Sequence, residues 1–343
     1  MERTELRIGF AYDRPVEADP VDTVRSVSAE YESARTIDWM RETLSELGRA
    51  IDLPWGPHVV AQMAAAGLDV VFNITEAAHG RNRESLIPAL AEACGVPCTG
   101  TDALGQGISL DKSYTKILAR HVGVPTARFV QVASMDQWET LLPDLQALRY
   151  PVIAKPTHGG SSMGIRRTSR AASLEQLYEE VAWIVGECGD SALVEEFIFG
   201  REFTVGLLAR PELEVLPIGE LLIGEATADS FYPFELKLTH DRQMVCPADL
   251  PGDLAASIAG HARRVFAVLG CRDIARLDFR VDPQGAPFFL EINPIPGLTP
   301  YGSAIPLLAQ AAGISPEEVI HQLVRNALAR PRPEGRAAIS NRP

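Results

Sequence analysis

The chain has 343 residues, of which 46% are hydrophobic and 22% charged, so it can bury more core than one small domain contains. Its formal net charge of −13 excludes a general nucleic-acid or anionic-membrane surface, because contact with phosphates of any sequence needs a basic patch. Five cysteines without a paired CxxC spacing favour reduced thiols over a disulfide framework or a zinc site. No apolar run approaches the length of a membrane span, and the charged start of the chain lacks the apolar core of a secretory signal. We therefore expect a cytoplasmic protein of two or three packed units.

The first third of the chain alternates apolar strands with amphipathic helices. Such alternation is typical of a parallel sheet covered by helices. Gly48 is a stop signal for the first helix. The pattern predicts strands over 6–12 and 68–72 and helices over 34–47 and 84–94.

A helix and a chain break begin the next unit. Asp111 can cap a helix that runs to about Val122. Gly123 and Pro125 then interrupt the chain before a strand over 127–132.

Two capping boxes follow in the middle of the chain. Ser134 with Gln137 and Ser173 with Gln176 each open a predicted helix. Between these helices lies a strand over 151–155 with a glycine-rich loop after it. Strands on both sides of the helices indicate a small α+β module.

The last part of the chain is dominated by strands. A proline and a glycine in the turn 282–285 predict a hairpin, and Ser315 opens the final helix. The proline- and arginine-rich end is expected to be a mobile tail. The predicted strands cover 192–196, 203–208, 214–222, 274–281 and 288–293, and the predicted helix before the hairpin covers 255–269.

The strongest local signal is a lysine at a strand end followed by a loop of small residues. Lys155 begins the run K-P-T-H-G-G-S-S-M-G, which ends at Gly164. Glycines let backbone N–H groups approach phosphate oxygens, serine hydroxyls add donors, and the lysine supplies a compact positive charge. The alternative, a flexible surface loop, remains open for this stretch alone, and the lysine at the strand end favours a phosphate site.

A second signal lies on the two strands of the hairpin. Arg276 and Asp278 share one face of the first strand, and Glu291 and Asn293 share one face of the second. Pairing of the strands could bring all four together, where carboxylate and amide oxygens suit Mg²⁺ and the arginine can stabilise negative charge. A solvated polar face on an edge hairpin is the alternative.

A third stretch joins a strand end to an acidic and apolar linker. Phe197 or Ile198 can line an adenine pocket, and the carboxylate of Glu202 can accept hydrogen bonds from ribose hydroxyls. Alone this pattern is weak, because charged residues at strand ends are usually solvated.

These stretches, in this order, resemble the ATP-grasp superfamily and specifically the D-alanine–D-alanine ligase family. The likeness covers most of the chain, and the collinearity of the motifs makes it specific. The matching segments are 71–76, 95–101, 110–112 with Lys116, the glycine–serine loop, 202–205 and 291–299.

The resemblance implies an α/β and α+β protein with the ATP-grasp fold, in which two α+β subdomains grip ATP behind an N-terminal parallel α/β domain. The implied divisions are 1–110 for the N-terminal domain, 111–194 for the central subdomain, 195–330 for the C-terminal subdomain and 331–343 for the tail.

The resemblance also implies a role for each matching residue. Lys112 and Lys155 would hold the phosphates, with Ser161 and Ser162 in the loop that closes over them. Magnesium, or manganese, would be bound by Asp278, Glu291 and Asn293. The remaining implied roles are adenine for Glu195, Glu196 and Ile198, ribose for Glu202, the γ-phosphate for Lys237, and the tetrahedral intermediate for Arg276 and the backbone N–H of Gly297.

The implied reaction is ATP-dependent ligation of a carboxylate to an amine. Phosphoryl transfer to the first amino acid gives an acyl phosphate, which the amine of the second attacks while closed loops exclude water. Formation of D-alanyl-D-alanine for peptidoglycan is the leading interpretation. A ligase for other amino acids, an ATP-binding module without activity and a kinase that releases its acyl phosphate are the alternatives. Family members are often dimers, which leaves a homodimer open.

The sequence departs from the family pattern around the amino-acid site. Glu30 matches the glutamate that binds the first amine, with Glu32 close by, but the linker before it is longer than in the family. Leu238 stands where a tyrosine is common, and Gly302 where a serine is common, with Ser303 adjacent. Pro294 and Ile295 also replace small hydroxylated residues. An amino-acid site that lacks these hydrogen-bond donors leaves polar groups of the substrate unpaired, which changes the specificity for the amino acids that are joined.

The remaining candidates have structural interpretations. Cys94 and Cys98 are expected to pack with apolar neighbours. Histidines His79 and His158 are each expected to be structural or solvated. Trp39 and Trp183 lie on predicted helices, where core packing is expected.

Overall fold

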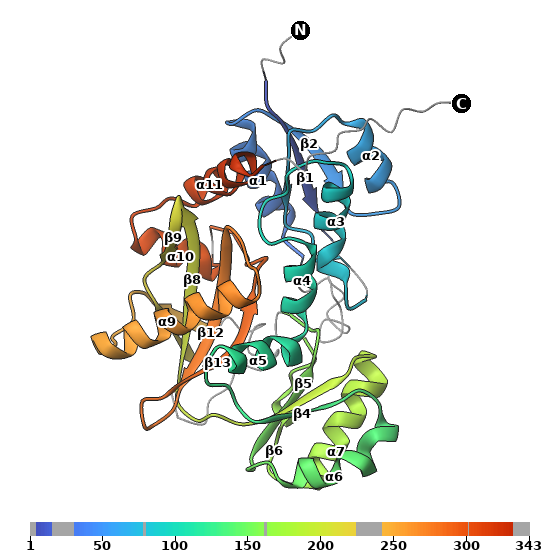
Figure 1. Cartoon of the computed structure of the whole chain (residues 1–343), viewed down its shortest axis with the longest axis vertical. Helices are drawn as coiled ribbons and strands as arrows, with labels where there is room; N and C mark the ends of the chain where they lie inside the picture. The colour runs from blue at the N-terminus through green and yellow to red at the C-terminus, as the bar shows by residue number, and fades with distance from the viewer. Residues whose placement is uncertain are drawn as a thin grey trace.

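The computed structural model describes residues 5–15, 31–77, 80–160, 163–223, 242–300 and 302–331. Within these residues three sheets succeed one another along the chain (Figure 1). No helix of the described part is long and apolar enough to cross a membrane.

A three-stranded parallel sheet with the order β2-β1-β3 forms the N-terminal part, as the alternation predicted. The sequence analysis missed β2, an edge strand whose Arg49 and Asp52 break the apolar pattern, and also missed two helices, α2 and α4. The predicted helix over 84–94 begins as a 3₁₀ turn over Arg83–Ser85. The elements are β1 (Arg7–Tyr12), α1 (Ala34–Ser45), β2 (Arg49–Pro54), α2 (Val59–Ala65), β3 (Val70–Asn73), α3 (Leu86–Ala93) and α4 (Ala103–Leu110).

The central sheet is antiparallel, with the order β4-β7-β5-β6 and helices α6 and α7 packed on it (Figure 1). Ser173 caps α7 as predicted, since its Oγ accepts a hydrogen bond from the backbone N–H of Gln176. Ser134 makes no such bond; a 3₁₀ turn precedes α6, and the Gln137 side chain accepts from Ala133 instead. The elements are β4 (Phe129–Val132), α6 (Trp138–Gln146), β5 (Val152–Pro156), β6 (Arg170–Ala171), α7 (Leu174–Trp183) and β7 (Ala192–Glu196).

The C-terminal sheet has the order β11-β10-β8-β12-β13, with β9 paired to β8. The single strand predicted over 214–222 is wrong. It is two strands, because Pro217 lacks the N–H that a continuing ladder needs. The predicted turn after β12 is confirmed by the bond from the Gly285 N–H to the Asp282 carbonyl. The elements are β8 (Arg201–Arg210), β9 (Glu212–Val215), β10 (Gly219–Ile223), β11 (Arg242–Val245), α9 (Gly252–Val268), β12 (Ile274–Val281), β13 (Pro287–Asn293), α10 (Ala304–Ala311) and α11 (Pro316–Ala329).

The hydrophobic cores cross the predicted divisions of the chain. Helix α5 (Lys112–His121) follows the cap residue Asp111, yet its Ala119 packs in the core of the C-terminal sheet, beside α9 and β13 (Figure 1). Another core joins β1, β3 and α1 to α10 and α11. The central sheet keeps a core of its own. The divisions at 111 and 195 therefore stay predictions, and α5 ties the C-terminal sheet to the loops around the site.

Candidate active site

A cavity of about 400 Å³ is lined by residues from all three parts of the chain. It contains most of the residues that the sequence analysis selected, although they come from distant segments. Four selected residues, Glu30, Ser161, Ser162 and Lys237, lie outside the described residues, as do His79 and Leu238. The selected residues that line the cavity are Lys112, Lys155, Glu195, Glu196, Ile198, Glu202, Arg276, Asp278, Glu291, Asn293 and Gly297.

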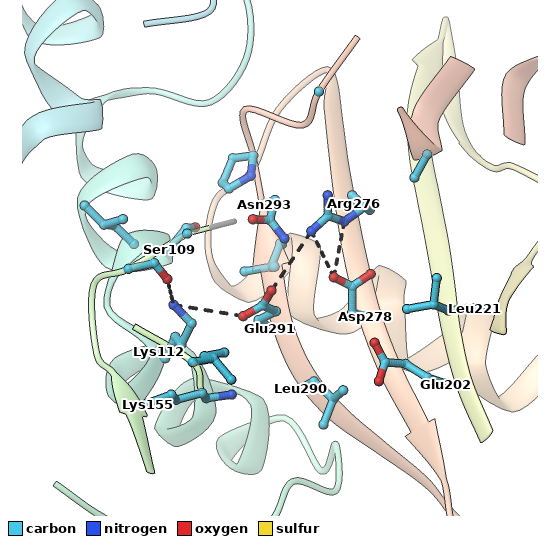
Figure 2. Close-up of a pocket in the computed structure, with 18 of the residues that line it drawn as sticks. Ser109, Lys112, Lys155, Glu202, Leu221, Arg276, Asp278, Leu290, Glu291 and Asn293 are labelled. Carbon is cyan, nitrogen blue, oxygen red and sulfur yellow. Dashed lines mark hydrogen bonds and ion pairs between the residues drawn. The ribbon is translucent and has the colours of Figure 1, made fainter. Parts of the chain in front are cut away.

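The hairpin of β12 and β13 brings together its four polar residues as the strand alternation predicted. Arg276 is the register partner of Asn293, and Asp278 is the partner of Glu291. Figure 2 shows the four side chains on the face that borders the cavity. One guanidinium nitrogen of Arg276 lies 3.0 Å from Asp278 Oδ2 and 4.0 Å from Glu291 Oε1. The arginine therefore lies between two carboxylates.

Two lysines, Lys155 and Lys116, are oriented by one buried carboxylate. Glu195 Oε1 lies 2.5 Å from Lys155 Nζ, and Oε2 lies 2.6 Å from Lys116 Nζ. Burial alone would raise the pKa of Glu195, but the two lysines bring it down to about 2. Burial lowers the pKa of Lys116 to about 8, against the attraction of Glu195. The Glu195 side chain thus positions the lysines, so only its backbone is free to border an adenine.

The neighbouring Glu196 points to other partners than Glu195 does. Its Oε1 accepts a hydrogen bond from the Arg149 N–H at 3.0 Å and lies 3.8 Å from the Arg128 guanidinium. The apolar wall nearby is formed by cavity residues of the linker and of the strands, and these are Ile153, Phe197, Ile198, Leu221, Leu290 and Ile292. A flat apolar ring fits between such side chains.

Lys112 is placed by a helix cap. Asp111 Oδ1 accepts hydrogen bonds from the N–H groups of Ser113 and Tyr114, which starts α5 at Lys112. The Lys112 ammonium donates to the Gly159 carbonyl and lies 3.9 Å from Glu291 Oε2. Its position between the glycine-rich loop and the hairpin suits an anionic ligand with several phosphates.

Arg280 is a residue of the cavity lining that the sequence analysis missed. It lies on β12 two residues beyond Asp278, and its guanidinium donates to Glu202 Oε2 at 2.6 Å and to the Ile198 carbonyl at 3.1 Å. The same alternation that selected Arg276 and Asp278 also places Arg280 on their face. The arginine fixes both the predicted ribose ligand and the linker between the two sheets.

The hairpin fits a divalent cation. Burial raises the pKa of Asp278, and the neighbouring Glu291 carboxylate raises it further, against the attraction of Arg276. A bound cation relieves this repulsion. Asn293 adds an amide whose nitrogen is buried without a hydrogen-bond partner among the described residues. These residues contain no group of three or more His, Cys, Asp or Glu side chains arranged for a metal, so phosphate oxygens would have to complete the set.

The cavity is closely packed around Gly297. A Cβ on Gly297 would lie 2.7 Å from Ser303 Oγ and 3.7 Å from Glu32 Oε1. Glu32 and Ser303 line the cavity, as does another carboxylate, that of Glu76. The sequence analysis noted Glu32 only as a neighbour of Glu30, and the described structure brings Glu32 to the site.

Several other predictions concern packing. All five cysteines are free, and Cys94 and Cys98 pack against the core of the N-terminal sheet as expected. Trp39 and Trp183 are partly buried on helices beside hydrophobic cores, also as expected. His158 was expected to be structural or solvated, and its ring lies between two carboxylates.

Comparison with known proteins identifies the family. A family model described as the D-ala D-ala ligase C-terminus matches residues 118–325. The D-alanine–D-alanine ligase of Marinobacter nauticus is 34% identical over 300 residues, which are 82% of this chain and 88% of that protein. An uncharacterized Sinorhizobium fredii protein, y4sG, is 39% identical over 257 residues, which are 74% and 73% of the two chains.

The fold is similar to that of solved ligases. The structure of the Bacillus anthracis D-alanine–D-alanine ligase complexed with ATP has a TM-score of 0.72 and 20% identity, with 95% of this chain and 98% of that chain covered. The matching family model, the similar relatives and the shared fold agree. The chain therefore belongs to the D-alanine–D-alanine ligase family and has the ATP-grasp fold.

Proposed function

We propose that the protein is an ATP-dependent carboxylate–amine ligase that acts through an acyl phosphate and forms D-alanyl-D-alanine. The observation that carries the proposal is the meeting of three groups in one cavity: Lys112 and Lys155, the hairpin residues Arg276, Asp278 and Glu291, and the carboxylates of Glu32 and Glu76. Cations and carboxylates that line the same cavity suit a reaction that joins phosphates, a carboxylate and an amine.

Each group has a chemical task in this proposal. The two lysines neutralise phosphate charge, and Arg276 stabilises negative charge that develops at the reacting carboxyl group. Asp278, Glu291 and Asn293 would hold Mg²⁺ or Mn²⁺, which would supply further neutralisation of the transferring phosphoryl group. The N–H of Gly297 would stabilise the developing oxyanion. Ser161, Ser162 and Lys237, outside the described residues, are the further proposed partners of the phosphates.

Binding of the first amino acid is assigned to an acidic side chain. Glu30 remains the proposed partner of its ammonium group, and Glu32, which lines the cavity, is the second candidate. We further propose a cytoplasmic location and a homodimer, which size-exclusion chromatography with light scattering would test.

A second candidate is a ligase that joins other amino acids. Pro294 and Ile295 line the cavity without hydroxyl groups, and Gly302 lines it without a side chain. A polar substrate group that finds no partner there binds less tightly, while a larger apolar side chain gains contact.

The deciding measurement is ADP release by the purified protein with Mg-ATP and single amino acids, D-alanine first, with mass spectrometry of the products. We expect D-alanine-dependent ADP release and D-alanyl-D-alanine. Release with a different amino acid would favour the second candidate. No amino-acid-dependent release with any of them would contradict the ligase proposal and favour an ATP-binding module.

A further inference from the structure

His158 links three segments at the root of the glycine-rich loop. Its Nδ1 lies 2.7 Å from Asp190 Oδ1, and its Nε2 lies 3.1 Å from Asp111 Oδ2. The backbone N–H of His158 donates to Asp190 Oδ2 at 2.8 Å. One imidazole therefore joins the loop to the turn before β7 and to the start of α5.

One of the two carboxylates, Asp111, also caps a helix close to the site. Asp111 Oδ1 caps the helix whose first residue is Lys112, so the carboxylate that contacts His158 also sets the position of this lysine. The residue after His158 is Gly159, whose carbonyl accepts the bond from the Lys112 ammonium. The histidine thus fixes both ends of the contact between Lys112 and the loop.

Another side chain, Arg83, connects the loop root with the N-terminal part of the chain. The Arg83 guanidinium donates to the His158 carbonyl at 3.3 Å and to the Glu76 carbonyl at 2.9 Å. Glu76 lines the cavity. The backbone of His158 is therefore held from the N-terminal part of the chain, while its ring is held from the other two segments.

We propose that His158 is a positioning residue of the ATP site, which as a cation between Asp111 and Asp190 holds Lys112 and the glycine-rich loop at the spacing that the nucleotide phosphates require. The inference rests on the proposed use of ATP. It adds a residue that is not among the described residues lining the cavity.

The charges around the ring favour the cation. Asp111 and Asp190 face its two nitrogens, while Arg81 lies 3.6 Å from Asp111. Lys112 and Arg83 are the other nearby cations. Burial lowers the pKa of His158, but the two carboxylates raise it to about 9 overall. The stabilisation is therefore complete below the ordinary pKa near 6.5 and is lost as the pH rises through 9.

The test compares the KM for ATP of the wild type and of H158Q between pH 7 and 10. Glutamine keeps hydrogen-bonding groups but carries no charge. We expect the substitution to raise the KM for ATP about tenfold at pH 7.5 and to change kcat by less, because a charge-assisted contact at the loop root is lost. The wild-type KM for ATP should rise as the pH passes 9. The KM of H158Q should not show the part of this rise that comes from deprotonation of His158.

Two comparisons keep the test decisive. H121Q changes an exposed histidine on the same helix α5 and should behave like the wild type. Burial lowers the pKa of Lys116 to about 8. Because Lys116 is present in both the wild type and H158Q, the difference between their pH profiles isolates His158. Direct binding of ATP by calorimetry gives the same readout without turnover.

An unchanged KM and an unchanged pH profile in H158Q would overturn the inference. A loss of kcat with an unaltered KM would overturn it too, since a residue that positions the phosphates should act on ATP binding and therefore on KM. If the wild type binds no ATP, the proposed function fails first, and the inference fails with it.

Discussion

At the scale of single residues, the site depends on charges that are almost fully buried. Glu195 is 3% exposed and serves Lys116 and Lys155 at once. E195Q would leave two buried ammonium groups with a neutral amide. We expect it to lower the free energy of unfolding by about 3–5 kcal/mol, as measured by urea denaturation, because a buried cation without its partner is strongly destabilising.

A pair with a half-exposed arginine serves as the control for this substitution. Arg201 and Glu220 lie 2.7 Å apart with the arginine half-exposed, so E220Q should cost at most about 1 kcal/mol. The pH dependence of the unfolding free energy gives a second test. Since folding lowers the pKa of Glu195, its contribution is present above its ordinary pKa near 4.5 and is lost as the pH falls toward 2. Equal losses for the two variants would contradict this account.

At the scale of elements, the linker between β7 and β8 decides how the two grasping sheets are joined. Gly200 has φ +129°, and a Cβ there would overlap the Val281 carbonyl oxygen. We expect G200A to destabilise the protein by about 1–3 kcal/mol or more, since this backbone region is nearly restricted to glycine. Urea denaturation would measure the change.

Gly260 in the middle of α9 provides the comparison, because nothing lies within 4 Å of a Cβ built there. G260A should be neutral or should stabilise the protein by roughly 0.5–1 kcal/mol through helix propensity. Tolerance of G200A to the same degree as G260A would show that the linker can adopt another conformation.

At the scale of the whole molecule, a buried ion pair fastens the end of the last helix to two other parts of the chain. Asp273 Oδ2 accepts a bond from the Gly100 N–H at 2.7 Å and lies 2.5 Å from Arg330. We expect R330M to lower the unfolding free energy by about 1.5–3 kcal/mol, because the Asp273 carboxylate loses its charged hydrogen-bond partner.

The same substitution should leave ATP binding unchanged, since Arg330 does not line the cavity. R325M, on the exposed side of α11, removes only a surface pair with Glu318 and should cost less than about 1 kcal/mol. Calorimetric ATP binding together with urea denaturation of both variants would separate the two effects. A weaker affinity of R330M for ATP would contradict the expectation that the Asp273–Arg330 contact does not affect the site.

The sequence by itself determined what depends on local geometry. Alternation along two strands and a Pro-Gly turn predicted that Arg276 and Asp278 would meet Glu291 and Asn293, and the register confirms it. The capping residues Ser173 and Ser315 could likewise be predicted from the sequence, since a cap is a contact between residues three apart. The family motifs added the fold, which the solved ligase structures confirm.

Only the tertiary structure decided the contacts between distant segments. No periodicity relates Glu195 to Lys116, Arg280 to Glu202, or His158 to its two carboxylates, because each pair meets through the packing of separate elements. The packing of α5 on the C-terminal sheet was hidden for the same reason. Local patterns report which side of an element is buried, whereas the partner on the other side is chosen by how the elements assemble.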